Sequence, residues 1–169
     1  MKKTLIVLAV LFITSVSCKK IIDPGGGLCA CSPVQEGFLT VVLKNNAGAD
    51  LLNPATAGYL SKEKIQLYIK NVSGGMRPIN FEIRQPFSYD NEKFEFYQLF
   101  SAEIFSLATS ADTDFYLKLG ESKEYVVNLK KMGNKKVEKL LIDKVEVPFE
   151  KSTPTPYDFV NSIFSFKQP

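Results

Sequence analysis

Hydrophobic and polar residues alternate in short runs along most of the chain beyond residue 34. In residues 64–70, isoleucine or leucine occupies every second position, with glutamine, tyrosine and lysine nearby, and residues 79–84 repeat the pattern. Successive side chains of a strand point to opposite faces of a sheet, so a period of two predicts half-buried strands. Runs rich in β-branched and aromatic residues predict further strands at residues 38–44, 93–101, 114–119, 124–131, 137–147 and 158–166.

The connections between these runs predict the fold class. Turn-forming sequences separate them, such as Asn71–Gly75, which is typical of a hairpin. Helical crossovers between strands are not visible, so we expect antiparallel pairing. Residues 34–169 are therefore expected to form an all-β domain, a single antiparallel β-sandwich of immunoglobulin-like or transthyretin-like type with about 7–9 strands. We expect only helical turns, near residues 61–63 and after Ser101.

The first 18 residues have a different pattern. Lys2 and Lys3 precede an apolar run, Leu5–Val16, which is followed by Ser17 and Cys18. A basic start, a short apolar segment and small residues before a cysteine are typical of a bacterial lipoprotein signal peptide. The run is shorter than the about 20 residues of a membrane-spanning helix. We therefore expect removal of residues 1–17 and lipidation of Cys18, with simple secretion as the main alternative.

Residues 18–33 are expected to form a flexible tether between the lipid and the domain. Gly25–Gly27 and the prolines on both sides disfavour regular structure. About fifteen such residues reach about 20 Å on average. Cys29 and Cys31 lie in this segment, and their spacing allows either a small strained disulfide or two thiols. Two thiols without further cysteine or histidine ligands do not indicate a metal or redox site.

Composition excludes several function classes. The chain has no histidine, which removes the commonest general base, the usual catalytic triads and most zinc and copper sites. Of the 21 basic residues, Lys2 and Lys3 leave with the signal, so 19 basic residues stand against 18 acidic ones. A protein that binds nucleic acid needs a clear excess of basic residues, so we expect no nucleic-acid partner. We assign no catalytic residues and expect no cofactor.

Two short segments are candidate binding sites. Tyr89 is the residue of an aromatic-rich stretch most expected to be exposed, and with Asp90 and Asn91 it can form a ligand platform. Asp112 and Asp114 have a spacing found in calcium sites, although such a site needs six or more oxygen ligands. Turn formation by these aspartates is the simpler interpretation. We therefore assign no metal site, with Asp112 and Asp114 as weak calcium candidates.

The sharpest charge cluster lies at residues 130–136, which contain four lysines around Met132, Gly133 and Asn134. Contact with anionic lipid or an acidic glycan is one interpretation. The simpler one is a hairpin tip or sheet edge, where lysines keep a domain soluble and prevent edge pairing.

Three segments carry a resemblance to a known group. Residues 50–54 (DLLNP), 65–69 (IQLYI) and 112–120 (DTDFYLKLG) are similar to small uncharacterised envelope lipoproteins of the Bacteroidota, over about residues 1–120. The resemblance implies an immunoglobulin-like or transthyretin-like sandwich and transfers no site. Surface-exported members often carry acidic residues after the lipidated cysteine, whereas Lys19 and Lys20 follow Cys18 here. This difference favours an outer-membrane lipoprotein that faces the periplasm.

These observations predict a lipid-anchored envelope protein with a binding or structural role. Its partners would be the membrane, through the anchor, and an envelope protein or a glycan. One alternative is a hydrolase that uses carboxylates alone on an envelope glycan, which needs two acids facing each other across a cleft. The other alternative is a calcium-stabilised adhesin module.

Overall fold

A computed structural model describes residues 37–89, 92–151 and 162–169. These residues belong to one compact unit, Gln35–Pro169. The segments predicted as signal peptide and tether, with Cys18, Cys29 and Cys31, and the pair Asp90 and Asn91 lie outside the described residues. No helix in the described ranges is long and apolar enough to cross a bilayer.

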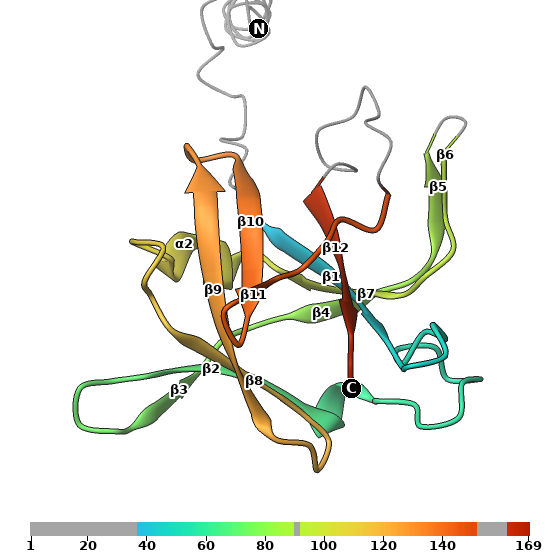
Figure 1. Cartoon of the computed structure of the whole chain (residues 1–169), viewed down its shortest axis with the longest axis horizontal. Coiled ribbons are helices and arrows are strands. Elements are labelled where there is room, and N and C mark those ends of the chain that lie inside the picture. The colour runs from blue at the N-terminus through green and yellow to red at the C-terminus, as the bar shows by residue number, and fades with distance from the viewer. Residues whose placement is uncertain (1–36, 90–91, 152–161) are drawn as a thin grey trace, which may run out of the picture. The chain divides into compact units, whose positions relative to one another are not determined.

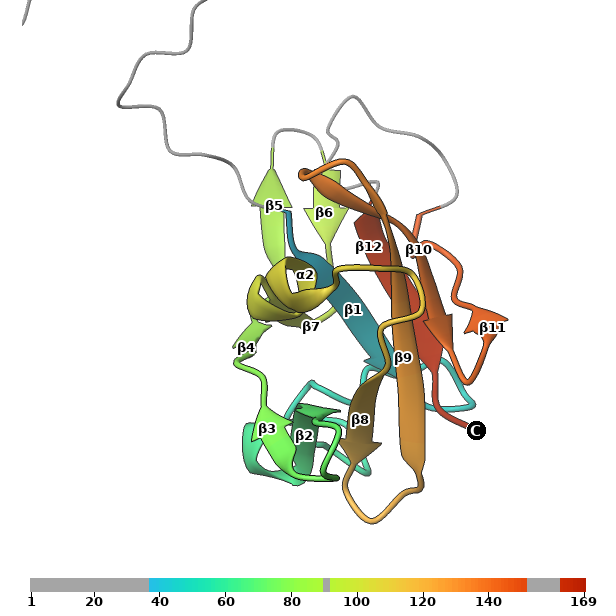
Figure 2. The ribbon, with the colours of Figure 1, turned by 90° about the vertical axis from the view of Figure 1, so that its left-hand side faces the viewer.

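The larger sheet has six strands in the order β11-β10-β9-β8-β2-β3 (Figures 1 and 2). All its strand pairs are antiparallel. Asn71–Gly75 connects β2 to β3, as predicted, with Lys70 opposite Met76. The strands are β2 (Ile65–Lys70), β3 (Met76–Pro78), β8 (Phe115–Leu119), β9 (Glu124–Met132), β10 (Lys136–Ile142) and β11 (Val145–Glu146).

The smaller sheet has four strands in the order β12-β1-β7-β4. These are β1 (Leu39–Lys44), β4 (Glu82–Arg84), β7 (Gln98–Ser101) and β12 (Ile163–Lys167). A separate hairpin is formed by β5 (Phe87–Tyr89) and β6 (Glu92–Phe94). Within residues 37–89, 92–151 and 162–169 the helical segments are η1 (Lys62–Lys64) and α2 (Glu103–Leu107), which confirms both predicted helical turns.

The two sheets enclose the core of an all-β sandwich, as predicted. Phe164 and Leu43 from the smaller sheet and Phe115 and Leu140 from the larger one are at most 1% exposed and belong to one hydrophobic cluster. The burial pattern of β8 alternates strictly, as expected for a strand with one face on the core. Strand β1 is buried on both faces, because Val42 packs with Phe94 and Ile163 in a second cluster on its other side.

Strict antiparallel pairing was a wrong prediction for one strand pair. β1 and β12 run parallel, with Val41 opposite Phe164 and Lys44 opposite Lys167. A parallel pair needs a long connection between its strands, and a helical crossover is the usual one. Because the sequence shows no helical crossover between neighbouring strands, it predicts no parallel pair. Here the connection is nearly the whole domain, because β1 is the first and β12 the last strand described. This pairing brings the C-terminal residues beside the end of β1, where the Gln168 N–H donates to the Lys44 carbonyl (2.8 Å).

The described residues form twelve strands rather than seven to nine, because two expected strands are divided and two short strands, β3 and β5, lie outside the expected runs. The run 93–101 is interrupted between β6 and β7, and the run 137–147 folds back between β10 and β11. Residues 79–81 precede β4 instead of belonging to it. Ile79 is nevertheless buried, and Phe81 and Ile83 pack against the core, so the predicted apolar face is confirmed.

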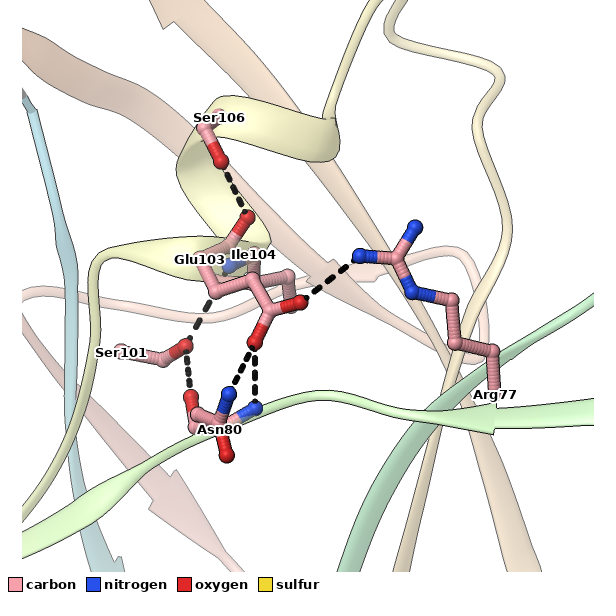
Figure 3. A network of polar contacts seen from close by, with 6 residues as sticks. All are labelled: Arg77, Asn80, Ser101, Glu103, Ile104 and Ser106. Carbon is pink, nitrogen blue, oxygen red and sulfur yellow. Dashed lines mark hydrogen bonds and ion pairs between the residues drawn. The ribbon is translucent and has the colours of Figure 1, made fainter.

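The short helix α2 is held by a polar network around Glu103 (Figure 3). Its carboxylate accepts hydrogen bonds from the backbone and side-chain nitrogens of Asn80 (both 2.8 Å) and pairs with Arg77 (3.0 Å). The Ser101 hydroxyl donates to the Asn80 carbonyl (2.6 Å) and accepts from the Ile104 N–H. Five residues do not make a stable helix alone, so these bonds and the buried Ile104 side chain supply its stability.

Candidate functional site

A polar hollow lies at one end of the domain. Its volume is about 500 Å³, in the range of sites that hold small ligands. We call it the polar groove. Its polar lining residues come from the loop before η1, from η1 and β2, from the end of β8 and the β8–β9 turn, and from the C-terminal segment: Tyr59, Glu63, Lys64, Gln66, Lys118, Glu121, Ser122 and Gln168.

Backbone hydrogen bonds fix the walls of this groove. The Leu60 N–H donates to the Leu51 carbonyl (2.8 Å), which folds the loop after β1 back on itself. Gly120 has a φ of +60°, and its N–H donates to the Lys64 carbonyl (2.7 Å), so the β8–β9 turn is tied to η1. A left-handed conformation favours glycine at this position. The groove is therefore formed by segments distant in sequence but joined by main-chain bonds.

Asp50 anchors the loop that forms one wall. Its side chain is buried and accepts hydrogen bonds from the Leu52 N–H (2.9 Å) and the Tyr97 N–H (2.7 Å). Burial raises the pKa of this carboxyl above its usual value, although both N–H groups and the charge of Lys44 oppose the shift. A raised pKa can mark a catalytic acid, but this carboxyl is occupied by backbone donors and does not line the polar groove.

The charges of the groove are balanced. Glu63 and Glu121 carry negative charge, and Lys64 and Lys118 carry positive charge. A hydrogen bond from the Ser61 side chain lowers the pKa of Glu63, so this carboxyl is ionised at neutral pH. A glycosidase general acid needs the opposite shift, towards a raised pKa. The groove offers hydrogen-bonding groups of both kinds with no net charge.

Gln168 also borders a second, more open hollow of about 350 Å³, formed with Asn45, Asn46 and Leu51. Gln168 therefore separates two adjoining depressions at this end of the domain. The asparagine side chains extend the set of amide groups available to a bound molecule beyond the groove itself.

The predicted platform at Tyr89 lies elsewhere. Tyr89 ends β5 and is 49% exposed, which agrees with the expectation that it is accessible. Phe87 is also exposed and stacks on Phe94 with ring centroids 4.6 Å apart. A smaller hollow of about 150 Å³ lies under this hairpin against Phe94 and Phe96, but Tyr89 does not line it.

Of the calcium candidates, Asp112 lies in a turn and Asp114 directly precedes β8. Asp112 is exposed, and Asp114 accepts a hydrogen bond from the Asn128 side chain (2.7 Å). The hydroxyl of Thr113 accepts from the Ser110 N–H (3.3 Å), which closes this turn. Among the described residues, no three histidine, cysteine, aspartate or glutamate side chains are grouped as a metal site requires.

An outward-facing cluster on the larger sheet is structural. Tyr68 donates a hydrogen bond to Glu124, which also pairs with Lys70 (2.7 Å). Tyr68 stacks on Tyr116, and the Lys70 amine lies 3.9 Å from the centre of the Tyr116 ring. Burial of Tyr68 and its bond to Glu124 raise the pKa of Tyr68 to about 12. Its phenol therefore stays protonated and acts as a donor within the sheet.

Sequence reasoning missed the polar groove. Its residues belong to four separate segments, none of which carries a recognisable motif. The unusual length of the loop before η1 was the available signal, because long loops in compact domains are often functional. Comparison of the chain with family models, with curated proteins and with solved structures finds no match.

Proposed function

We propose that this protein is a lipid-anchored lipoprotein of the bacterial outer membrane that faces the periplasm and binds an uncharged or zwitterionic glycan segment in the polar groove. The observation that carries the proposal is the groove itself: a hollow of about 500 Å³ lined by amide, hydroxyl, carboxylate and ammonium groups. The signal pattern ending at Cys18 supports the location.

The shape and chemistry of the groove favour a glycan over a protein partner. Sugar hydroxyls both donate and accept hydrogen bonds, and Gln66, Gln168 and Ser122 can do the same. Tyr59 is half-buried in the wall and offers an aromatic ring in a chain without tryptophan. A protein interface would instead be expected to present a broad surface with an apolar centre.

The balanced charge of the groove restricts the class of ligand further. A strongly acidic glycan would meet Glu63 and Glu121, and a strongly basic ligand would meet Lys64 and Lys118. Like charges brought together on binding cost affinity, so the groove selects against both. The lowered pKa of Glu63 makes this residue a poor proton donor, which favours a binding role for it over that of a general acid.

The test is a titration of the purified, detergent-solubilised protein with defined glycans, followed by calorimetry. The panel contains peptidoglycan fragments, neutral oligosaccharides and an acidic polysaccharide. We expect saturable binding of a peptidoglycan fragment or a neutral oligosaccharide, weakened about ten-fold by Tyr59→Ala, the loss expected from one aromatic contact. Tyr89→Ala is the matched control and should leave binding unchanged.

The outcomes separate the two candidate sites. Loss of binding in Tyr89→Ala but not in Tyr59→Ala would move the site to the β5–β6 hairpin. Absence of binding across the panel would reject the glycan proposal. Mass analysis of the mature N-terminus tests the anchor independently, with diacylglyceryl on Cys18 as the expected result.

A further inference from the structure

The chain enters the domain at a fixed position beside the lysine cluster. Gly37 is the first described residue, and its N–H donates to the Asn134 carbonyl in the β9–β10 turn (3.1 Å). Its Cα packs against the Phe105 ring so closely that a Cβ would lie 2.3 Å from that ring. Gly37, where the described part of the domain begins, is therefore held against the β9–β10 turn and α2.

The same turn carries the lysine cluster of residues 130–136, which the structure places at a hairpin tip, as predicted. Met132 pairs with Lys136 across the turn, and Gly133 has a φ of +60°. The amine of Lys131 donates to the Phe105 carbonyl (3.2 Å), and Lys130 pairs with Glu138 (3.1 Å). Lys135 is exposed at the tip, and Met132 beside it is 55% exposed.

The polar groove lies at the other end of the domain. In Figures 1 and 2, β9 ends at the top, at the same end of the domain as the β5–β6 hairpin, whereas η1 and the β8–β9 turn, which line the groove, lie at the bottom. Strand β5, which ends at the exposed Tyr89, points to the same end as the lysine turn. Basic residues with an exposed aromatic and a methionine are the combination that suits a membrane surface.

We propose that the β9–β10 turn, Met132–Lys136, docks on an anionic lipid bilayer and so holds the polar groove away from the membrane. The inference rests on the proposed lipid anchor at Cys18. A flexible tether alone would let the domain tumble, because it constrains distance and not orientation. Each lysine near an anionic surface shifts the population of the docked state by about five-fold.

Two exposed methionines provide an internal comparison for the test. Met132 lies in the docking turn, and Met76 begins β3 and is 66% exposed. The lipidated full chain is bound to vesicles of phosphatidylglycerol and phosphatidylethanolamine, or of phosphatidylcholine alone, and is treated briefly with peroxide. Mass spectrometry then gives the oxidation rate of each methionine.

We expect Met132 oxidation to slow by about five-fold or more relative to Met76 on the anionic vesicles only. Lys135→Glu should abolish this protection. Lys144→Glu, an exposed charge reversal in the β10–β11 turn, is the matched control and should retain it. Equal rates for both methionines on anionic vesicles would overturn the docking while leaving the anchor intact.

Two further results are also decisive. Equal protection of Met132 on both kinds of vesicle would reject recognition of anionic lipid. Recovery of the native protein with an unmodified Cys18 would overturn the anchor and, with it, the docking that depends on the anchor.

Discussion

Replacing Asp50 by alanine tests whether one buried carboxylate holds the loop that forms the wall of the polar groove. In the folded protein it accepts two backbone hydrogen bonds, from Leu52 (2.9 Å) and Tyr97 (2.7 Å). Leaving a buried donor without an acceptor costs about 1–3 kcal/mol. Relief of the desolvation of the carboxylate offsets part of this loss, so we expect Asp50→Ala to lower the free energy of unfolding by about 2–3 kcal/mol.

Asp50→Asn keeps one acceptor oxygen and should lower the free energy of unfolding by about half as much as Asp50→Ala. Asn53→Ala is the matched control, because the Asn53 side chain accepts a single exposed hydrogen bond, from the Ala55 N–H (2.9 Å), and should cost less than about 1 kcal/mol. Urea denaturation of the three variants gives these values. Because Leu60 is bonded to Leu51 next to Asp50, Asp50→Ala should also weaken glycan binding at Tyr59.

The pH dependence provides a second check on Asp50. Burial raises its pKa in the folded state above 3.8, so protonation stabilises the fold and this contribution is lost as pH rises through the raised pKa. The cost of Asp50→Ala should therefore be larger at pH 4 than at pH 7. A cost no greater than that of Asn53→Ala at both pH values would refute the role assigned to this carboxylate.

Three other substitutions test separate parts of the structure. Gly37→Ala should destabilise the domain by about 1–3 kcal/mol in urea unfolding, because its Cβ would press on the Phe105 ring; a neutral effect would contradict the close packing. The hydrogen bond from the Asn80 N–H lowers the pKa of Glu103 below 4.5, so the stability that the ionised Glu103 adds to the fold is complete above pH 4.5 and is lost as pH falls. In Glu103→Gln the free energy of unfolding should therefore fall less between pH 5 and pH 3 than in the unsubstituted protein. An unchanged pH profile would exclude this contribution of Glu103. Tyr68 ionises near pH 12, so its contribution is complete below pH 10 and lost as pH rises towards 12; ultraviolet titration should show one late phenolate that is absent in Tyr68→Phe.

Strands with a strict period of two were predictable from sequence, and their exceptions have local causes. Residues 64–70 alternate and form β2, with its start shifted by one residue. The run 93–101 has strong strand propensity, but the Tyr97 N–H bonds to Asp50 instead of a neighbouring strand, so the strand is interrupted. Tertiary hydrogen bonding overrides propensity there.

The β10–β11 turn shows a second limit of sequence patterns. Asp143 and Lys144 have φ values of 51° and 66°, a conformation usually signalled by glycine or asparagine. The Asp143 side chain supports it by accepting from the Val126 N–H (2.9 Å) and pairing with Lys123 (2.6 Å). These partners come from β9 and the β8–β9 turn, so no local pattern reveals the turn.

The candidate site was less predictable than the fold. The exposure of Tyr89 and the hairpin position of the lysine cluster follow from local sequence, because each lies within one hairpin. The polar groove depends on the parallel pairing of β1 with β12 and on the bond from Gly120 to Lys64, which join segments distant in sequence. The local sequence pattern of these segments carries no signal for such long-range contacts.

Amide hydrogen exchange of the lipidated protein, with and without a saturating concentration of the oligosaccharide that binds in the titration, tests the central claim most directly. The proposal predicts slower exchange at residues 58–66 and 118–122, which line the groove, and unchanged exchange at residues 87–94. Protection confined to residues 87–94, or no protection in any described segment, would contradict it.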